Sequence, residues 1–424
     1  MSPSPHIPIW QLRARFAAAL SAMYGAEVPA YTTLVAVSAE VNAAYVASHP
    51  HAQRLGSLDR VTAERHGAIR VGTAREIGEV ATLFAAFGMH PVGFYDLRDA
   101  ASPVPVISTA FRPTTPDELA RNPFRVFTSV LATADRRFFG DELRARVEHF
   151  LSRRSLFDPD LIARAGRIGA AGGCPAETAD QFVADAVAAF ALSREPIDKA
   201  WYDELAAVSA VAADIAGVTT THVNHLTPRV LDIDELYRRM TARGIAMIDA
   251  IQGPPRIDGP AVLLRQTSFR ALAEPRRLRH PDGSVHEGPL RVRFGEVEAR
   301  GVALTPAGRQ RYDAAMAAPD PAATWGEHFP ATDREFADQQ LAYYVGGDPT
   351  KPVVYEDFLP ASAAGIFRSN LDSEARRTAG DDDVDDDDID DDDSEYSEQW
   401  LAGALGRELL DPYALYQKAA ECPP

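Results

Sequence analysis

A histidine and an arginine four residues apart, His66 and Arg70, are the residues of this chain best suited to chemistry at a single site. Positions i and i+4 lie on one face of a helix and also on one face of a strand, so the two side chains point the same way in either structure. An imidazole binds metal ions, and a guanidinium binds a carboxylate through two parallel hydrogen bonds. The pair therefore predicts a site that holds a metal ion beside an anionic ligand.

A second histidine lies in the segment Asn224 to Arg229. If this segment is extended, His225 and Thr227 share a polar face, whereas Leu226 faces the opposite, apolar side. A hydrogen-bonded structural histidine explains His225 as well as a metal ligand does. The sequence leaves both interpretations open.

A third candidate is one of two carboxylates, Glu296 and Glu298, at the end of an alternating segment that begins at Leu290. Carboxylates that continue an apolar strand face are unusual unless they are paired or bind a metal. Because the two residues have the same parity, alternation does not choose between them, and a solvent-exposed strand end explains both. Two histidines and one carboxylate on separate strands form a facial triad for Fe(II), and the same ligands can hold catalytic zinc.

Hydrophobic periodicity predicts an α+β fold in which a helical block separates two sheet-forming regions. Two helices are expected within 10–50, with Pro29 between them, and three or more helices within about 141–216. Strands are expected in short segments of 66–130 and of 218–310, and no internal sequence repeat stands out. We expect one catalytic domain that spans residues 1–424.

Composition and charge exclude several classes of protein. The chain has 424 residues, 46% of them hydrophobic, and a net charge of −18. Eleven aspartates between Asp381 and Asp393 account for most of that charge, and they predict a disordered acidic loop at about 376–395. The remainder is mildly acidic and has no basic stripe for nucleic acid. Only two cysteines occur, and neither a signal peptide nor a membrane span is evident, so we expect a cytoplasmic location.

Six motifs resemble the 2-oxoadipate dioxygenase/decarboxylase family, also called the hydroxyglutarate synthase family. They occur in order and extend over nearly the whole chain, which makes the resemblance far more specific than any single triad. The motifs span residues 64–73, 122–129, 224–229, 263–269, 293–296 and 355–367.

The resemblance implies a vicinal-oxygen-chelate-like core: a curved β-sheet around a metal site, with peripheral helices. It also implies an Fe(II)-dependent enzyme that converts 2-oxoadipate and O₂ to 2-hydroxyglutarate and CO₂ in lysine catabolism. By motif, His66, His225 and Glu296 are the iron ligands, which favours Glu296 over Glu298. Arg70 resembles the arginine that holds a substrate carboxylate.

Three further residues are candidates for the substrate pocket. Ala361 and Ser362 fall where the family's Pro-Val-Ser segment lines the pocket, and Arg265 is a reserve cation for the substrate. Ile107 and Ala361 depart from the histidine and valine of the family pattern, so we expect both to change the shape or polarity of the pocket. The alternatives to an iron oxygenase are a zinc-dependent hydrolase and a non-catalytic metalloprotein that binds 2-oxo acids.

Overall fold

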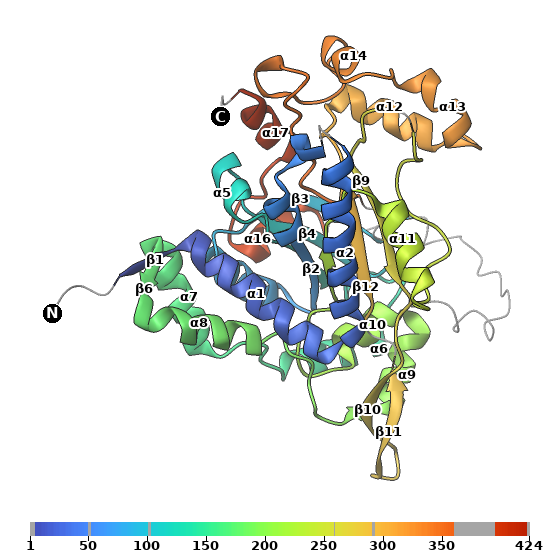
Figure 1. The fold of residues 1–424 in the computed structure, drawn as a ribbon. Helices are drawn as coiled ribbons and strands as arrows, with labels where there is room; N and C mark the ends of the chain where they lie inside the picture. Colours follow the sequence, from blue (N-terminus) through green and yellow to red (C-terminus); the bar gives the residue numbers. More distant parts are fainter. Residues whose placement is uncertain are drawn as a thin grey trace.

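The protein folds around a mixed β-sheet that is covered by helices, as the computed structural model in Figure 1 shows. Helices and strands are interspersed along the chain, so the predicted α+β class is confirmed. No helix in the described part of the chain is both long and apolar enough to cross a membrane. The structure describes residues 5–49, 52–100, 103–257, 259–290, 293–359 and 395–421.

A strand–helix–three-strand unit within residues 65–131 forms the first half of the sheet. In this unit β4 lies between β3 and β5 and pairs antiparallel with both, and β5 also pairs in parallel with β2. The short helix α5 (Pro116–Arg121) joins β4 to β5. The unit consists of β2 (Arg65–Val71), α4 (Ala74–Ala85), β3 (His90–Asp96), β4 (Val106–Arg112) and β5 (Arg125–Leu131).

The same order of elements recurs within residues 225–300, although the sequence shows no repeat. The extended segment 246–252 runs antiparallel to β9, β9 runs antiparallel to β12, and β12 meets β8 at a parallel bridge between Arg229 and Glu298. In each half, the last strand therefore lies beside the first. The second half consists of β8 (His225–Pro228), α11 (Ile233–Ala242), the segment 246–252, β9 (Leu264–Phe269) and β12 (Gly295–Arg300).

The two halves join through their first strands. β2 and β8 pair antiparallel, with Gly67 opposite Leu226 and Ala68 opposite His225. This pairing extends the first half to a five-stranded sheet of order β3-β4-β5-β2-β8, and β12 and β9 continue it beyond β8. Two βαβββ units joined in this way form the vicinal-oxygen-chelate-like core that the motifs implied.

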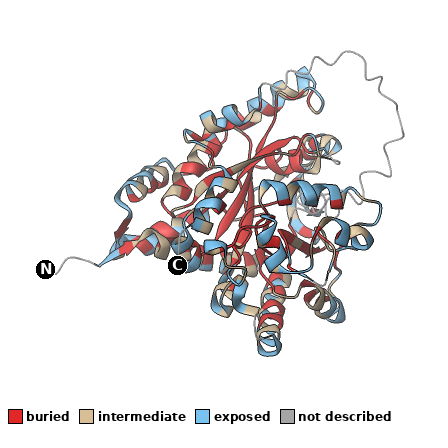
Figure 2. Ribbon diagram, turned by 90° about the horizontal axis from the view of Figure 1, so that it is seen from above, coloured by how far each residue is buried: buried red, intermediate tan, exposed pale blue. Residues whose placement is uncertain are grey.

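Helices cover one face of this sheet. α1 (Ile9–Glu27), α2 (Pro29–Ser48) and α4 contribute Phe16, Leu34 and Phe84 to a hydrophobic core that also contains Ile69 and Val130 from the strands. In Figure 2 the strands at the centre are buried, and the outer faces of the surrounding helices are exposed. The opposite face of the sheet is the one that carries polar side chains.

Ile107 lies on the helix-covered face. It pairs with Val130 in β5 and belongs to the same hydrophobic core as Val71. Because side chains alternate along a strand, Ser108 and not Ile107 points to the polar face. Our expectation that Ile107 changes the substrate pocket is therefore wrong.

The predicted helical block between the two halves is present. Two short strands interrupt its helices in sequence: β6 (Gly173–Pro175), which pairs with β1 (His6–Pro8), and β7 (Ile197–Asp198), which pairs with β10 (Glu274–Arg279). β10 and β11 (Val285–Leu290) form the hairpin at the bottom of Figure 1. The helices are α6 (Asp141–Ser152), α7 (Pro159–Ala171), α8 (Ala176–Ala188), α9 (Lys199–Val208) and α10 (Ala210–Ala216).

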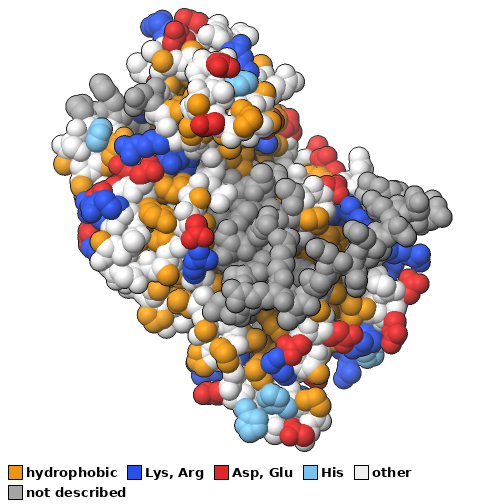
Figure 3. Space-filling model, turned by 90° about the vertical axis from the view of Figure 1, so that its right-hand side faces the viewer, with side chains coloured by type: hydrophobic (Ala, Val, Ile, Leu, Met, Phe, Trp, Pro, Cys, Tyr) orange, Lys and Arg blue, Asp and Glu red, His pale blue; other side chains and the backbone are white. Residues whose placement is uncertain are grey.

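Among the remaining elements, α12, α13, α14 and α17 lie at the end of the molecule opposite this hairpin, whereas α16 packs against α4. On the face of the molecule in Figure 3, basic (blue) and acidic (red) side chains are interspersed, and hydrophobic side chains (orange) lie between them. The predicted acidic loop lies outside the described residues, apart from Glu395. These elements are η1 (Ala52–Leu55), α3 (Leu58–Ala63), α12 (Pro306–Met316), α13 (Pro321–His328), α14 (Asp333–Asp338), η2 (Val345–Gly347), α16 (Glu398–Leu405) and α17 (Pro412–Glu421).

Candidate active site

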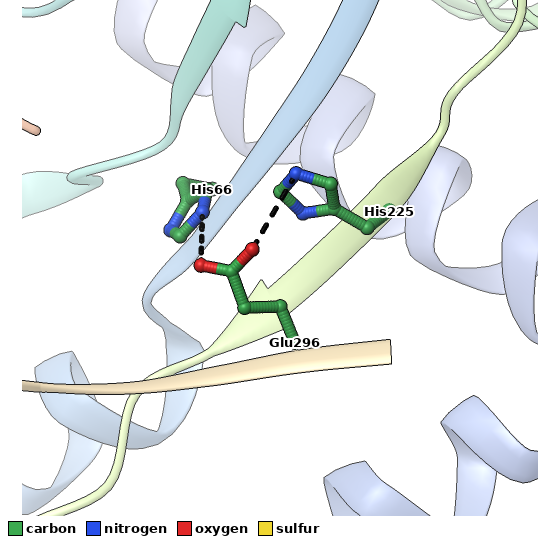
Figure 4. A group of neighbouring side chains, drawn as sticks. All are labelled: His66, His225 and Glu296. Atoms are coloured by element: carbon green, nitrogen blue, oxygen red, sulfur yellow. Dashed lines mark ion pairs between the residues drawn. The ribbon is translucent and has the colours of Figure 1, made fainter. Parts of the chain in front are cut away.

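His66, His225 and Glu296 meet on the polar face of the sheet, where each comes from a different strand (Figure 4). Nε2 of His66 lies 3.5 Å from Oε1 of Glu296, and Nε2 of His225 lies 3.6 Å from Oε2 of the same carboxylate. One donor atom from each residue lies within 4.8 Å of the other two. The structure therefore brings together the three residues that the sequence predicted as metal ligands.

Both histidines present Nε2 to the cluster, and another side chain lies close to Nδ1 of each ring. Nδ1 of His66 lies 3.0 Å from Oε2 of Glu298, and Nδ1 of His225 lies 3.0 Å from the hydroxyl of Thr227. Partners of this kind fix the ring orientation and the tautomer of a metal-binding histidine. Two oriented imidazoles and one carboxylate are suitable ligands for a divalent transition metal.

All three donors are buried, and the alternative of a solvent-exposed strand end is wrong. Glu296 is 4% exposed and Glu298 is fully buried. Burial raises the pKa of Glu296, although His66 opposes this shift. Burial, together with the positive charges of His66 and Arg70, holds the pKa of His225 well below its usual range. His225 is consequently a neutral imidazole, which is the form that binds metal.

Glu298 is anchored in a buried network of opposite charges. Arg300 donates to both of its carboxylate oxygens, at 2.7 and 2.8 Å, and Arg125 donates to it at 3.4 Å. Although burial raises the pKa of Glu298, the charges of Arg300 and His66 lower it to about 2. Glu298 is therefore an anion that faces Nδ1 of His66. Glu64, Glu356, Arg60 and Arg229 complete the network.

Arg70 lies on the same face of β2 as His66 and forms an ion pair with Asp214 of α10. Both side chains are buried. The carboxylate of Asp214 also accepts a hydrogen bond from the side chain of Asn224 at 2.8 Å, and it lies 3.3 Å from Nε2 of His222. We did not single out Asp214 from the sequence, although a lone charge in the apolar run from Val211 to Val218 is a signal for a buried functional group.

Arg265 does not belong to the cluster. It lies opposite Ala299 in the β9–β12 pairing, so its side chain has the parity opposite to that of Glu296. Its guanidinium donates to Asp234 at 2.7 Å, at the start of α11. The other two residues predicted for the substrate pocket, Ala361 and Ser362, lie outside the described residues.

Aromatic rings form the walls around the two histidines. Phe358 packs against the His66 ring with its centroid 4.9 Å away, and Phe294 stacks on the His225 ring at 5.1 Å. Phe127 packs against Phe358 at 5.1 Å. An apolar surround of this kind limits the access of water and strengthens electrostatic interactions inside the site.

The paired βαβββ units, with a three-donor cluster on one face of the joined sheet, define a vicinal-oxygen-chelate-like protein with a candidate metal site. The family model for 2-oxoadipate dioxygenase/decarboxylase matches residues 16–370. The chain belongs to this family, and it is therefore an enzyme. It is 68% identical, over 99% of both chains, to the 2-oxoadipate dioxygenase/decarboxylase of Mycobacterium tuberculosis.

More distant relatives agree with this assignment. The chain is 38% identical to the 2-oxoadipate dioxygenase/decarboxylase of Escherichia coli, over 97% of this chain and 96% of that protein. Its structure resembles the crystal structure of hydroxyglutarate synthase from Pseudomonas putida in complex with 2-oxoadipate. That likeness has a TM-score of 0.79 and 36% identity, over 98% of this chain and 96% of the other.

Proposed function

We propose that this enzyme is an Fe(II)-dependent dioxygenase that converts 2-oxoadipate and O₂ to 2-hydroxyglutarate and CO₂, as a step of lysine catabolism. The observation that carries the proposal is the convergence of His66, His225 and Glu296 in a chain of this family. The reaction balances, since one O₂ supplies both oxygens that the products contain beyond those of the substrate. The activity in the relatives' names and the 2-oxoadipate complex from Pseudomonas putida support the choice of substrate.

In this proposal, His66, His225 and Glu296 hold the iron. Iron bound there would supply a Lewis acid for the 2-oxo acid group and the redox chemistry with O₂. Three protein ligands leave positions open for substrate and oxygen. The facial arrangement of two histidines and one carboxylate is typical of such iron sites, whereas the names of the relatives do not support a hydrolase or a non-catalytic binding protein.

The other residues of the site bind and orient. Glu298 and Thr227 hold the two imidazoles with Nε2 toward the cluster. Arg70 supplies a cation for one carboxylate of the dianionic substrate, on the same face of the sheet as His66. The rings of Phe127, Phe294 and Phe358 exclude water from the reacting centre.

The test is an oxygen-uptake experiment with metal-free protein. The protein is loaded anaerobically with Fe(II), then mixed with 2-oxoadipate and O₂, and we expect equal amounts of O₂ consumed, CO₂ released and 2-hydroxyglutarate formed. Zn(II) loading should give no turnover. Turnover with zinc, or without O₂ consumption, would refute the proposal.

A matched pair of variants, His225→Ala and Arg265→Ala, tests whether iron binding and turnover depend on this site. His225→Ala should lose iron and nearly all turnover, because an open site with only two protein ligands binds iron weakly. Arg265→Ala should keep both, since Arg265 is bound to Asp234 and lies away from the cluster. Equal losses in both variants would show that the iron lies elsewhere.

A further inference from the structure

Asp214 is a buried carboxylate that reaches the site from the helical block, which otherwise contributes none of the residues assigned so far. It lies on α10, and its ion pair with Arg70 has side-chain exposures of 4% and 3%. A buried guanidinium needs a counter-charge, so neutralisation of Arg70 explains the pair in part. Neutralisation alone does not require the further contacts that hold Asp214 itself.

Two residues close to His225 in sequence contact the Asp214 carboxylate. Asn224 donates its side-chain N–H to Oδ2 at 2.8 Å, and Nε2 of His222 lies 3.3 Å from Oδ1. Asn224 is itself fixed, because its backbone N–H donates to the carbonyl of Ala68 at 2.9 Å. Ala68 lies between His66 and Arg70 on the same face of β2. Asp214 is thus tied to the two strands that carry the histidines.

The helix that carries Asp214 is anchored at its carboxyl end. Arg154 donates to the backbone carbonyls of Ile215 and Val218, the latter at 3.0 Å. Arg154 is in turn held by two hydrogen bonds, of 2.7 and 2.8 Å, from its guanidinium to the carboxylate of Glu76. α10 therefore presents Asp214 from a fixed position.

We propose that Asp214 is a positioning residue that sets the direction of the Arg70 guanidinium toward a substrate carboxylate. This inference rests on the proposed function, in which Arg70 binds that carboxylate. A guanidinium is planar, so a carboxylate that binds Nη1 fixes the plane in which the remaining N–H groups point. The Arg70–Asp214 pair is also neutral in sum, so directed hydrogen bonds, more than net charge, select the substrate. The helical block thereby takes part in substrate selection.

The test compares Asp214→Asn, Arg70→Lys and the double variant, with iron content and the KM for 2-oxoadipate as readouts. Asparagine keeps the size of the side chain but removes the charge that holds Arg70. We expect Asp214→Asn to keep its iron and to raise KM about tenfold, which corresponds to about 1.4 kcal/mol. In the Arg70→Lys background, the same change should raise KM less than twofold, because Asp214 acts through Arg70.

Three results would overturn the inference. They are a KM for Asp214→Asn within twofold of the unaltered enzyme, a lower KM, and an equal effect of Asp214→Asn in both backgrounds.

Asp135→Asn is the control, because Asp135 is also buried and also pairs with arginines, Arg98 and Arg137. The Asp135→Asn substitution should lower stability without changing KM. If Asp214→Asn does not fold, Asn224→Ala removes the 2.8 Å contact and should raise KM two- to fivefold; an unchanged KM there refutes the inference too.

The comparison also separates this inference from the proposed function. If Arg70→Lys leaves KM unchanged, the assignment of Arg70 to a substrate carboxylate fails. If Arg70→Lys raises KM and Asp214→Asn does not, Arg70 keeps its role and only the positioning by Asp214 fails.

Discussion

Glu298→Gln tests whether the charged network behind His66 tunes the metal site. Oε2 of Glu298 lies 3.0 Å from Nδ1 of His66, and Arg300 donates hydrogen bonds to both oxygens of the same carboxylate. Glutamine has the same shape but no charge, so His66 keeps a polar neighbour and loses its anionic one. Loss of such a partner typically weakens metal binding 10- to 100-fold. We therefore expect iron affinity to fall by that factor, about 1.4–2.7 kcal/mol.

The measurement is an anaerobic Fe(II) competition titration against a chromogenic chelator. Thr227→Val is the matched comparison, because Thr227 contacts Nδ1 of His225 through a neutral hydroxyl at the same 3.0 Å. Its effect should be smaller than that of Glu298→Gln, below about tenfold. Circular dichroism and the melting temperature establish that both variants are folded. A folded Glu298→Gln protein that binds iron within twofold of the unaltered enzyme would refute the argument.

Three further outcomes are expected. Glu296→Ala should abolish iron binding in the same titration while the melting temperature of the metal-free protein stays within a few degrees; retained iron would remove Glu296 from the ligand set. Arg265→Ala should leave the KM for 2-oxoadipate within twofold, and a tenfold rise would return Arg265 to the substrate site. Glu274→Gln should destabilise the protein at pH 7 by about 1–3 kcal/mol, because Glu274 accepts charged hydrogen bonds from Arg293. Burial raises the pKa of Glu274, but Arg293 lowers it below its usual value, so this stabilisation exists at neutral pH and is lost as the pH falls below about 4.5. The difference in melting temperature between the unaltered protein and Glu274→Gln should therefore become smaller from pH 7 to pH 3. A difference that stays constant over this range would contradict the assignment.

Local signals pointed to His66 and Glu296 as candidate metal ligands, whereas His225 was assigned only through the resemblance of its motif. Alternation along a strand placed His66 and Arg70 together and gave Glu296 an unusual position on an apolar face, and the motifs then distinguished Glu296 from Glu298. Those signals hold whichever strands become neighbours. The predicted helices within 10–50 and 141–216 are confirmed for the same reason, since helical periodicity is a property of one segment.

The relations between distant segments were not predictable. Whether Arg265 faces the site depends on its register opposite Ala299, and the role of Asp214 depends on where α10 lies against β2. The recurrence of the βαβββ unit is a pattern of hydrogen bonds between strands, and it left no repeat in the residues themselves. Ile107 shows the same limit, because its face became evident only from its pairing with Val130.

The antiparallel pairing of β2 with β8 has a consequence for how the enzyme folds. Each βαβββ half holds one of the two histidines, and the helical block separates them in the chain; the buried pair of Glu64 with Arg229 spans 165 residues. Contacts of such high sequence separation form slowly, because a long loop must close before any of them stabilises the chain. The three donors therefore meet only when the halves dock. Iron should bind the protein with docked halves and neither half alone, so that it stabilises the fully folded state. The appearance of iron binding during refolding would then mark the completion of docking.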